Sequence, residues 1–185
     1  MPAGGTTSFR GPGDSKYKGF DLEFSAQPSE WLDLQGTLAY TDGEMTSFSS
    51  RGSNESVVLG SGALSVVNDG NRPRNTPTWT ASLSPTFLGD LGDRQWFFRW
   101  DFLYHSATWA DYSEFNFQQD QFLINARAGI DLFDGSRIEI YGKNLTQDKT
   151  LNLNGGTTSG PGGNRKVFNE PYQRREFGVR LSAEF

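Results

Sequence analysis

The chain has 185 residues, with 17 Lys and Arg against 22 Asp and Glu, which gives a formal net charge of -5 at pH 7. This acidic balance, without a basic stripe, argues against nucleic-acid binding, and the absence of cysteine excludes disulfides and thiolate metal sites. Mean hydropathy is only -0.60, yet the chain has 15 Phe, 6 Tyr and 5 Trp. Such a composition is more typical of half-exposed sheets than of a helical core.

Apolar and polar side chains alternate in seven segments, which predicts seven β-strands. In chain order these segments are 16–27, 31–42, 77–87, 95–105, 120–132, 137–145 and 173–185. Pro85 cannot donate a hydrogen bond to a neighbouring strand, so we expect a bulge or the strand's end near it. The polar stretch 43–76 contains two weak apolar pieces, 57–59 and 63–67, and either could form a short hairpin arm.

The connections between these segments fall into two classes that alternate strictly along the chain. The short turns are 28–30, 88–94 and 133–136, and the long loops are 43–76, 106–119 and 146–170. Outer-membrane barrels have short periplasmic turns and longer extracellular loops, and no stretch here has the 18 or so apolar residues of a membrane-spanning helix. The pattern therefore predicts an all-β, up-and-down meander in a barrel wall, with every short turn at one end.

The two faces of each predicted strand differ in charge. In the middle of each strand, the apolar face has no Lys, Arg, Asp or Glu, while Lys18, Asp42 and Arg175 share its phase only near strand ends. We expect the apolar face to contact lipid and the other face to line a hydrated lumen. On the lumenal face, Asp131 and Arg137 should form a cross-strand ion pair across the 133–136 turn.

The order of these features resembles the C-terminal end of a TonB-dependent outer-membrane receptor. The stretches that resemble this family are RNTPTWTASLSPTF (74–87), FLINARAGIDLFDG (122–135), IEIYGKNLTQDK (138–149) and YQRREFGVRLSAEF (172–185). The resemblance implies that residues 1–185 are the last part of a 22-stranded transmembrane β-barrel, a fragment without the plug domain. It also implies a location in the bacterial outer membrane, contact with its lipid, and contact with TonB only through missing N-terminal parts.

Two groups of residues are candidates for function within a complete receptor. Arg72 and Arg74 could attract an anionic ligand such as a ferric siderophore, and the loop aromatics Trp109, Tyr112 and Phe115 offer stacking surfaces. The alternatives are that the aromatic side chains pack the loop down or belong to an aromatic girdle, and that the arginines lie at a solvated strand entry. By resemblance, the terminal strand is a barrel-assembly signal for the insertion machinery, with the following residues on its apolar face: Phe177, Val179, Leu181 and Phe185.

The sequence favours a transporter and gives little support to an enzyme. With one histidine, His105, and no cysteine, we predict no catalytic residues, no metal site and no cofactor. The transported ligand stays open between a siderophore, cobalamin and a glycan. Two alternatives also stay open: part of another, porin-like outer-membrane barrel, or a soluble all-β binding module whose apolar face packs on a second sheet.

Overall fold

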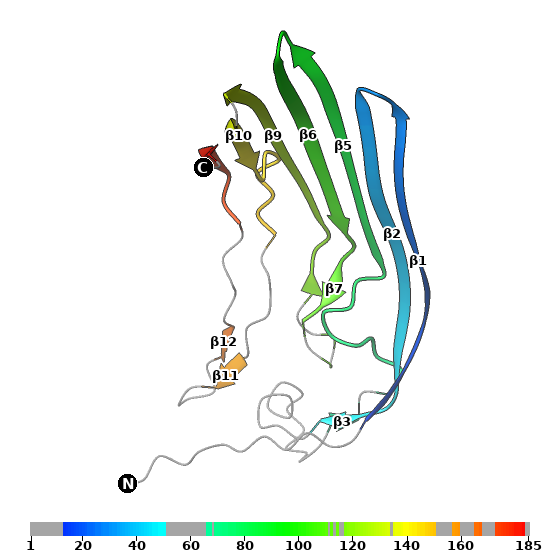
Figure 1. The fold of residues 1–185 in the computed structure, drawn as a ribbon. Helices are drawn as coiled ribbons and strands as arrows, with labels where there is room; N and C mark the ends of the chain where they lie inside the picture. The colour runs from blue at the N-terminus through cyan, green and yellow to red at the C-terminus, as the bar shows by residue number, and fades with distance from the viewer. Residues whose placement is uncertain are drawn as a thin grey trace.

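The computed structural model describes residues 13–50, 66–67, 69–110, 112, 114, 117–133, 135–150, 157–159, 165–167 and 173–183. Seven strands form one antiparallel sheet, and their order in the sheet is their order in the chain (Figure 1). They are β1 (Asp14–Ser29), β2 (Leu32–Ser47), β5 (Trp79–Leu91), β6 (Arg94–His105), β9 (Gln121–Phe133), β10 (Ser136–Lys143) and β13 (Glu176–Ala183). The predicted seven-stranded meander is confirmed. Among the described residues, no helix is long and apolar enough to cross a membrane.

Three small two-stranded sheets lie in the long connections. They are β3 (Ser49–Ser50) with β4 (Val66–Val67), β7 (Thr108–Trp109) with β8 (Phe117–Gln118), and β11 (Thr157–Ser159) with β12 (Arg165–Val167). The predicted hairpin arm at 63–67 is therefore confirmed in its last two residues, which pair with Ser49 and Ser50. The arm at 57–59 lies outside the described residues.

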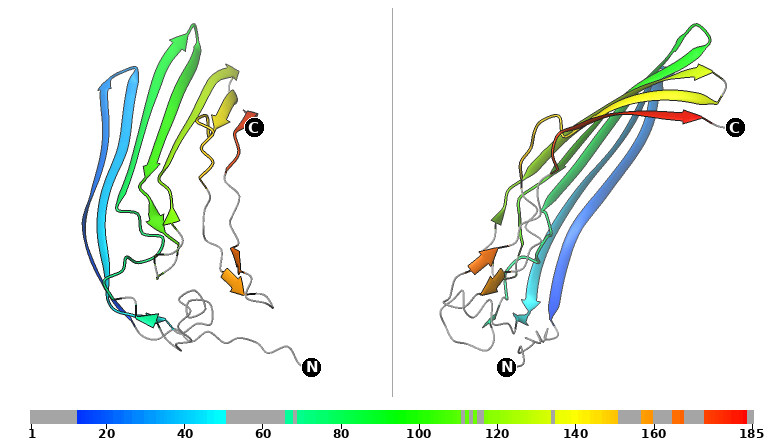
Figure 2. Two further views of the ribbon diagram at one scale, coloured as in Figure 1. Left: turned by 180° about the vertical axis from the view of Figure 1, so that it is seen from behind. Right: turned by 90° about the vertical axis from the view of Figure 1, so that its left-hand side faces the viewer.

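The short turns lie at one end of the sheet and the long connections at the other (Figure 1). The turn between β1 and β2 is Glu30–Trp31, and the turn between β5 and β6 is Gly92–Asp93. β13 ends at the short-turn end too, because Ala183 pairs with Ser136. The sheet is strongly curved when seen from the side, as a segment of a barrel wall would be (Figure 2). The predicted division into a short-turn end and a long-loop end is confirmed.

The register brings the apolar positions of all seven strands onto one continuous face. One row of paired residues runs from Gly36 through Leu83 and Phe102 to Ile124, with no charged residue. Large side chains on this face are exposed, for example 54% for Leu22 and 58% for Ile140. Among the described residues, Met45 is the one hydrophobic side chain that is buried, so no part of the described chain packs over the apolar face.

Aromatic rings mark both borders of the apolar face. Near the long-loop end, Tyr40 and Trp79 pack with ring centroids 4.7 Å apart, and at the short-turn end Trp31 stacks on Phe87 at 6.1 Å. From Trp31 to Tyr40, β2 rises about 30 Å along its length, or about 23 Å across a membrane at a tilt of about 40°. This matches the apolar band of about 25 Å that outer-membrane barrels show.

Three details of the predicted strands are wrong. β2 continues to Ser47 rather than ending near Asp42, because β1 keeps pairing with it beyond the aromatic border. β5 continues to Leu91, so the turn is much shorter than predicted; Asp90 pairs with Gln95 although both are polar. Near Pro85 there is neither a bulge nor a strand end. Only the pairing toward β6 is interrupted there, and its register is unchanged on the two sides of the gap.

Candidate functional site

Both candidate arginines lie in the segment that leads into β5 at the long-loop end. This segment is fixed beside the outer part of β2 by two backbone hydrogen bonds: Met45 N–H donates to Asn71 O at 2.9 Å, and Gly70 N–H donates to Met45 O at 2.7 Å. Met45 is 1% exposed under this contact. The backbone that presents Arg72 and Arg74 is therefore held by the wall itself.

The connection between β6 and β9 packs against the same segment, although the two are far apart in sequence. The Asn71 side-chain amide donates to Tyr112 O at 2.9 Å, and Asn75 N–H donates to Trp109 O at 2.7 Å. In addition, Arg72 N–H donates to Glu114 Oε1 at 2.7 Å. Three hydrogen bonds thus join the two long connections into one surface.

The joined connections place cationic and aromatic groups together, in a cluster that we define by Phe48, Arg72, Arg74, Trp109 and Tyr112. The Arg74 guanidinium carbon lies 5.0 Å from the centre of the Tyr112 ring, and that ring packs on Phe48 at 4.5 Å. Arg72 Nη1 donates to Thr78 Oγ1 at 2.6 Å. Both arginines are exposed, and neither forms an ion pair with a carboxylate among the described residues. The loop cluster therefore presents positive charge on an aromatic base.

The sequence-predicted site residues differ in where the structure places them. The side chains of Arg74 and Tyr112 come together as described, whereas the Arg72 guanidinium binds Thr78. Trp109 is joined to the segment before β5 through its backbone carbonyl, and its ring packs on Phe117 at 5.0 Å, which stabilises the β7–β8 pair. Phe115 lies outside the described residues. Of the C-terminal group, Phe177, Val179 and Leu181 lie on β13 with 69%, 68% and 71% exposure, and Phe185 is outside the described residues.

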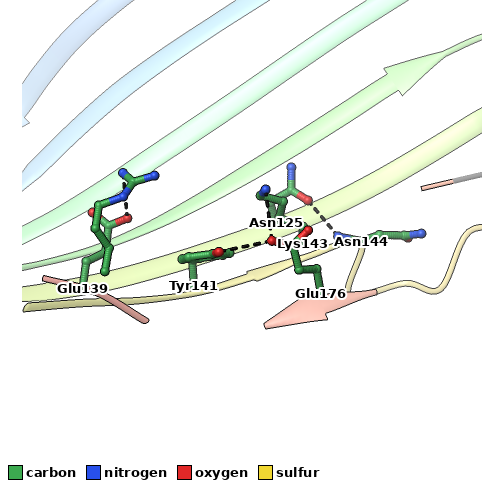
Figure 3. A network of polar contacts seen from close by, with 7 residues as sticks. Asn125, Glu139, Tyr141, Lys143, Asn144 and Glu176 are labelled. Carbon is green, nitrogen blue, oxygen red and sulfur yellow. Dashed lines mark hydrogen bonds and ion pairs between the residues drawn. The ribbon is translucent and has the colours of Figure 1, made fainter. Parts of the chain in front are cut away.

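The predicted ion pair on the polar face is confirmed, and similar pairs lie beside it. Arg137 Nε donates to Asp131 Oδ1 at 2.6 Å. Farther along β10, Lys143 Nζ lies 3.4 Å from Glu176 Oε1, and the Tyr141 hydroxyl donates to the same oxygen at 3.1 Å (Figure 3). Both ring nitrogens of His105 have hydrogen-bond partners: Nδ1 lies 3.2 Å from the carbonyl oxygen of Ser106, and Nε2 lies 3.1 Å from Gln121 Oε1. Among the described residues, no three His, Cys, Asp or Glu side chains gather as metal ligands.

A turn after β10 is organised by Asn144, whose structural role the sequence reading missed. Asn144 has φ +49° and is 1% exposed. Its side-chain oxygen accepts from Thr146 Oγ1 and from Asp148 N–H, and its amide donates to the carbonyls of Asp148 and Gln173. An asparagine in Asn-Leu-Thr could have signalled this, because Asn tolerates the left-handed region and bonds to backbone two to four residues on.

Asp148 closes the same turn by accepting backbone N–H bonds from Phe122 at 2.9 Å and Thr150 at 2.7 Å. Partial burial of the carboxyl would raise its pKa, but the hydrogen bonds from Thr150 and Phe122 and the charge of His105 together hold the pKa below its usual value. Because the folded pKa is the lower one, the stabilisation is complete above about pH 4 and is lost as the pH falls through the folded pKa.

We expect the 144–150 turn to open in acid below about pH 4, since protonation of Asp148 removes two charge-assisted hydrogen bonds. The measurement is protease sensitivity of the turn in the purified receptor between pH 3 and pH 6, with an acid-tolerant protease. The Asp148→Asn variant should be more sensitive at pH 6 and should lose the pH dependence. An identical pH profile in the two proteins would contradict this assignment.

Most of this chain matches one known protein family. The family model described as TonB dependent receptor-like, beta-barrel matches residues 1–166. This chain belongs to the TonB-dependent receptor family. A search of curated proteins found no match. Members of the TonB-dependent receptor family are transporters of the bacterial outer membrane rather than enzymes, so the prediction of a non-enzymatic protein is confirmed by membership.

Solved structures of TonB-dependent receptors share the fold of this chain. The ferric yersiniabactin uptake receptor FyuA of Yersinia pestis has a TM-score of 0.73 at 15% identity, covering 94% of this chain and 24% of that receptor. For the ferric preacinetobactin receptor BauA of Acinetobacter baumannii, the TM-score is 0.64 at 15% identity, covering 95% and 25%. For the siderophore receptor PiuA of Acinetobacter baumannii, the TM-score is 0.68 at 16% identity, covering 91% of this chain and 21% of that receptor. The chain thus spans about a quarter of these receptors.

Proposed function

We propose that this chain forms part of the barrel wall of an outer-membrane transporter that takes up a ferric siderophore. Family membership and the charge-free apolar face support the membrane wall. The observation that supports the ligand class is the loop cluster, where the exposed Arg74 lies on the Tyr112 ring. Guanidinium groups bind carboxylate and catecholate-type anions, and aromatic rings stack on chelates, so the cluster suits an anionic ferric siderophore.

Similarity to solved receptors supports the same ligand class. PiuA is described as a siderophore receptor, FyuA as a ferric yersiniabactin uptake receptor and BauA as the ferric preacinetobactin receptor. Nothing in these comparisons favours cobalamin or a glycan specifically. In this proposal, residues 1–185 are the C-terminal segment of a 22-stranded barrel. The receptor contacts TonB through parts outside this segment, and β13 is the strand that the barrel-insertion machinery recognises. The exposed apolar row Phe177, Val179 and Leu181 supports that last assignment.

The test is ligand binding to the purified receptor that contains this segment. A panel of ferric siderophores, with cobalamin and an oligosaccharide as comparison ligands, is titrated while tryptophan fluorescence is recorded. We expect at least one anionic ferric siderophore to bind, and Arg74→Ala to weaken it about tenfold, the equivalent of about 1.4 kcal/mol for one lost charge-assisted contact.

The matched control is Arg137→Ala, which removes an arginine at the short-turn end, far from the loop cluster. It should leave the affinity unchanged. Binding of cobalamin or the oligosaccharide alone would contradict the siderophore assignment. Equal effects of the two alanine variants would show that Arg74 does not contact the ligand.

A further inference from the structure

Among the described residues of the polar face, one arginine has no partner for its charge within the sheet. Arg127 on β9 pairs in register with Arg99 on β6 and with Tyr141 on β10. Arg99 is neutralised by Asp101, whose Oδ1 lies 2.7 Å from its Nε. Arg127 belongs to no ion pair among the described residues, and its Nε is buried without a hydrogen-bond acceptor. Like charges directly opposite each other are unfavourable unless an anion lies between or beside them.

Arg127 lines a hollow of about 300 Å³ on this face. Four cationic side chains and two acidic ones line it, namely Arg99, Arg127, Lys143 and Arg180 against Asp101 and Glu139. The acidic groups are already engaged, because Asp101 pairs with Arg99 and Glu139 lies 3.6 Å from Arg180. Lys143 also has an acidic partner, since its Nζ lies 3.4 Å from Glu176 Oε1, outside the lining of the hollow. The surplus positive charge of the hollow is therefore that of Arg127.

A neutral hydrogen-bond donor, the side-chain amide of Asn125, also lines the hollow. Asn125 uses its side-chain oxygen to accept from Asn144 N–H at 2.9 Å (Figure 3), which leaves its amide nitrogen as a donor. A planar anion with two oxygens satisfies a guanidinium through two parallel N–H···O bonds, which a chloride ion cannot do. The arrangement of a guanidinium and an amide donor in a positively charged hollow is suited to a carboxylate.

We propose that Arg127 is the centre of a carboxylate-binding site on the polar face of the sheet. The proposal rests on the proposed function only in placing this face inside a receptor barrel. Two sources can supply the carboxylate: a soluble ligand that enters the lumen, or an Asp or Glu side chain of another part of the same receptor. Both use the same contact with Arg127, and they differ in whether an added carboxylate can still bind.

The experiment uses the intact purified receptor and the variants Arg127→Gln and Arg127→Lys, with Arg137→Gln as the matched arginine outside the hollow. Citrate is titrated by calorimetry at constant ionic strength, with chloride as the balancing anion. For a soluble source, citrate binds the wild type saturably, Arg127→Gln weakens it on the order of tenfold or more, and Arg127→Lys weakens it less. Arg137→Gln leaves the citrate affinity unchanged.

If the carboxylate comes from another part of the receptor, citrate does not bind the wild type. The midpoint of thermal unfolding is then the deciding measurement. Arg127→Gln then lowers the midpoint by at least about 2 °C and by more than Arg137→Gln does, because it leaves a carboxylate unpaired. If no carboxylate contacts Arg127, removing a positive charge beside Arg99 leaves the midpoint unchanged or raises it. That outcome without citrate binding overturns the proposal, as does citrate binding that Arg127→Gln does not weaken.

A second variant and a second ligand distinguish failure of this proposal from failure of the variant to fold and from failure of the proposed function. If Arg127→Gln does not insert into the membrane, Arg127→Lys provides both readouts, since it keeps the charge and loses the two-pronged geometry. Ferric siderophore binding is measured on the same wild-type preparation. Its absence contradicts the proposed function, while the citrate and unfolding results still decide the role of Arg127.

Discussion

Replacing Leu83 with arginine should strongly impair insertion of this sheet into the membrane, whereas Ser82→Arg on the neighbouring residue should be tolerated. Leu83 pairs with Gly36 on one side and with Phe102 on the other, half-way between the two aromatic borders of the apolar face. An arginine at the midplane of a barrel's lipid face destabilises it by about 2–4 kcal/mol. Ser82 points to the polar face, where its Oγ lies 2.7 Å from Thr37 Oγ1.

The two variants are matched in strand, depth and introduced residue, and they differ only in the face. The folded fraction is measured as the heat-modifiable band of the outer-membrane receptor, and the free energy of unfolding is measured in guanidinium chloride. We expect Leu83→Arg to lower both and Ser82→Arg to lose only the Thr37 contact, about 1 kcal/mol. Equal losses in the two variants would contradict the assignment of the apolar face to lipid.

The division of the sheet into two faces was predictable because successive side chains of a strand point to opposite faces, and apolar residues recur at every second position. A shift of one residue in β6 or β10 would have placed Arg99 or Glu139 on the apolar face. The observed register avoids this in the pairs that these two strands form. The ends of β2 and β5 were not predictable in the same way. Beyond the aromatic borders both faces meet water, so pairing continues without an apolar pattern to reveal it.

The candidate site was predictable only as a set of residue types. Arg74 and Tyr112 lie on different connections, and no periodicity in either segment indicates that their side chains meet at 5.0 Å. Their contact depends on the hydrogen bonds of Asn71 and Asn75 to the second connection, which are specific to the folded structure. For the same reason the lone charge of Arg127 becomes visible only when the register places it opposite Arg99.

The wall and the loop cluster depend on each other through the extension of β1 and β2 beyond the apolar face. Met45 N–H binds Asn71 O in that extension, so the strand fixes the height at which Arg72 and Arg74 are presented. Toward the opposite edge of the sheet, the turn around Asn144 fixes the start of β9 and the end of β10 in a similar way. Fixing the loop bases to the strands in this way limits the entropy that ligand binding must overcome.

Replacing Asn144 with alanine should destabilise the receptor by about 2–4 kcal/mol and should loosen the attachment of β13. The side chain makes four hydrogen bonds, each contributing about 1 kcal/mol, and alanine is unfavourable at φ +49°. The bond to Gln173 O matters most for assembly, because Gln173 leads directly into β13. We therefore expect lower outer-membrane levels as well as a lower free energy of unfolding.

Variants at two positions separate the side-chain bonds from the backbone conformation. Asn144→Gly removes the same four bonds but accepts the positive φ, so it should be about 1 kcal/mol more stable than Asn144→Ala. Gln147→Ala is the matched control, because Gln147 has φ +55° in the same turn and its side chain is exposed. It should change the free energy of unfolding by less than about 0.5 kcal/mol. A loss as large as that of Asn144→Ala would mean that the turn responds to any substitution, and that the Asn144 bonds do not hold β13 in place.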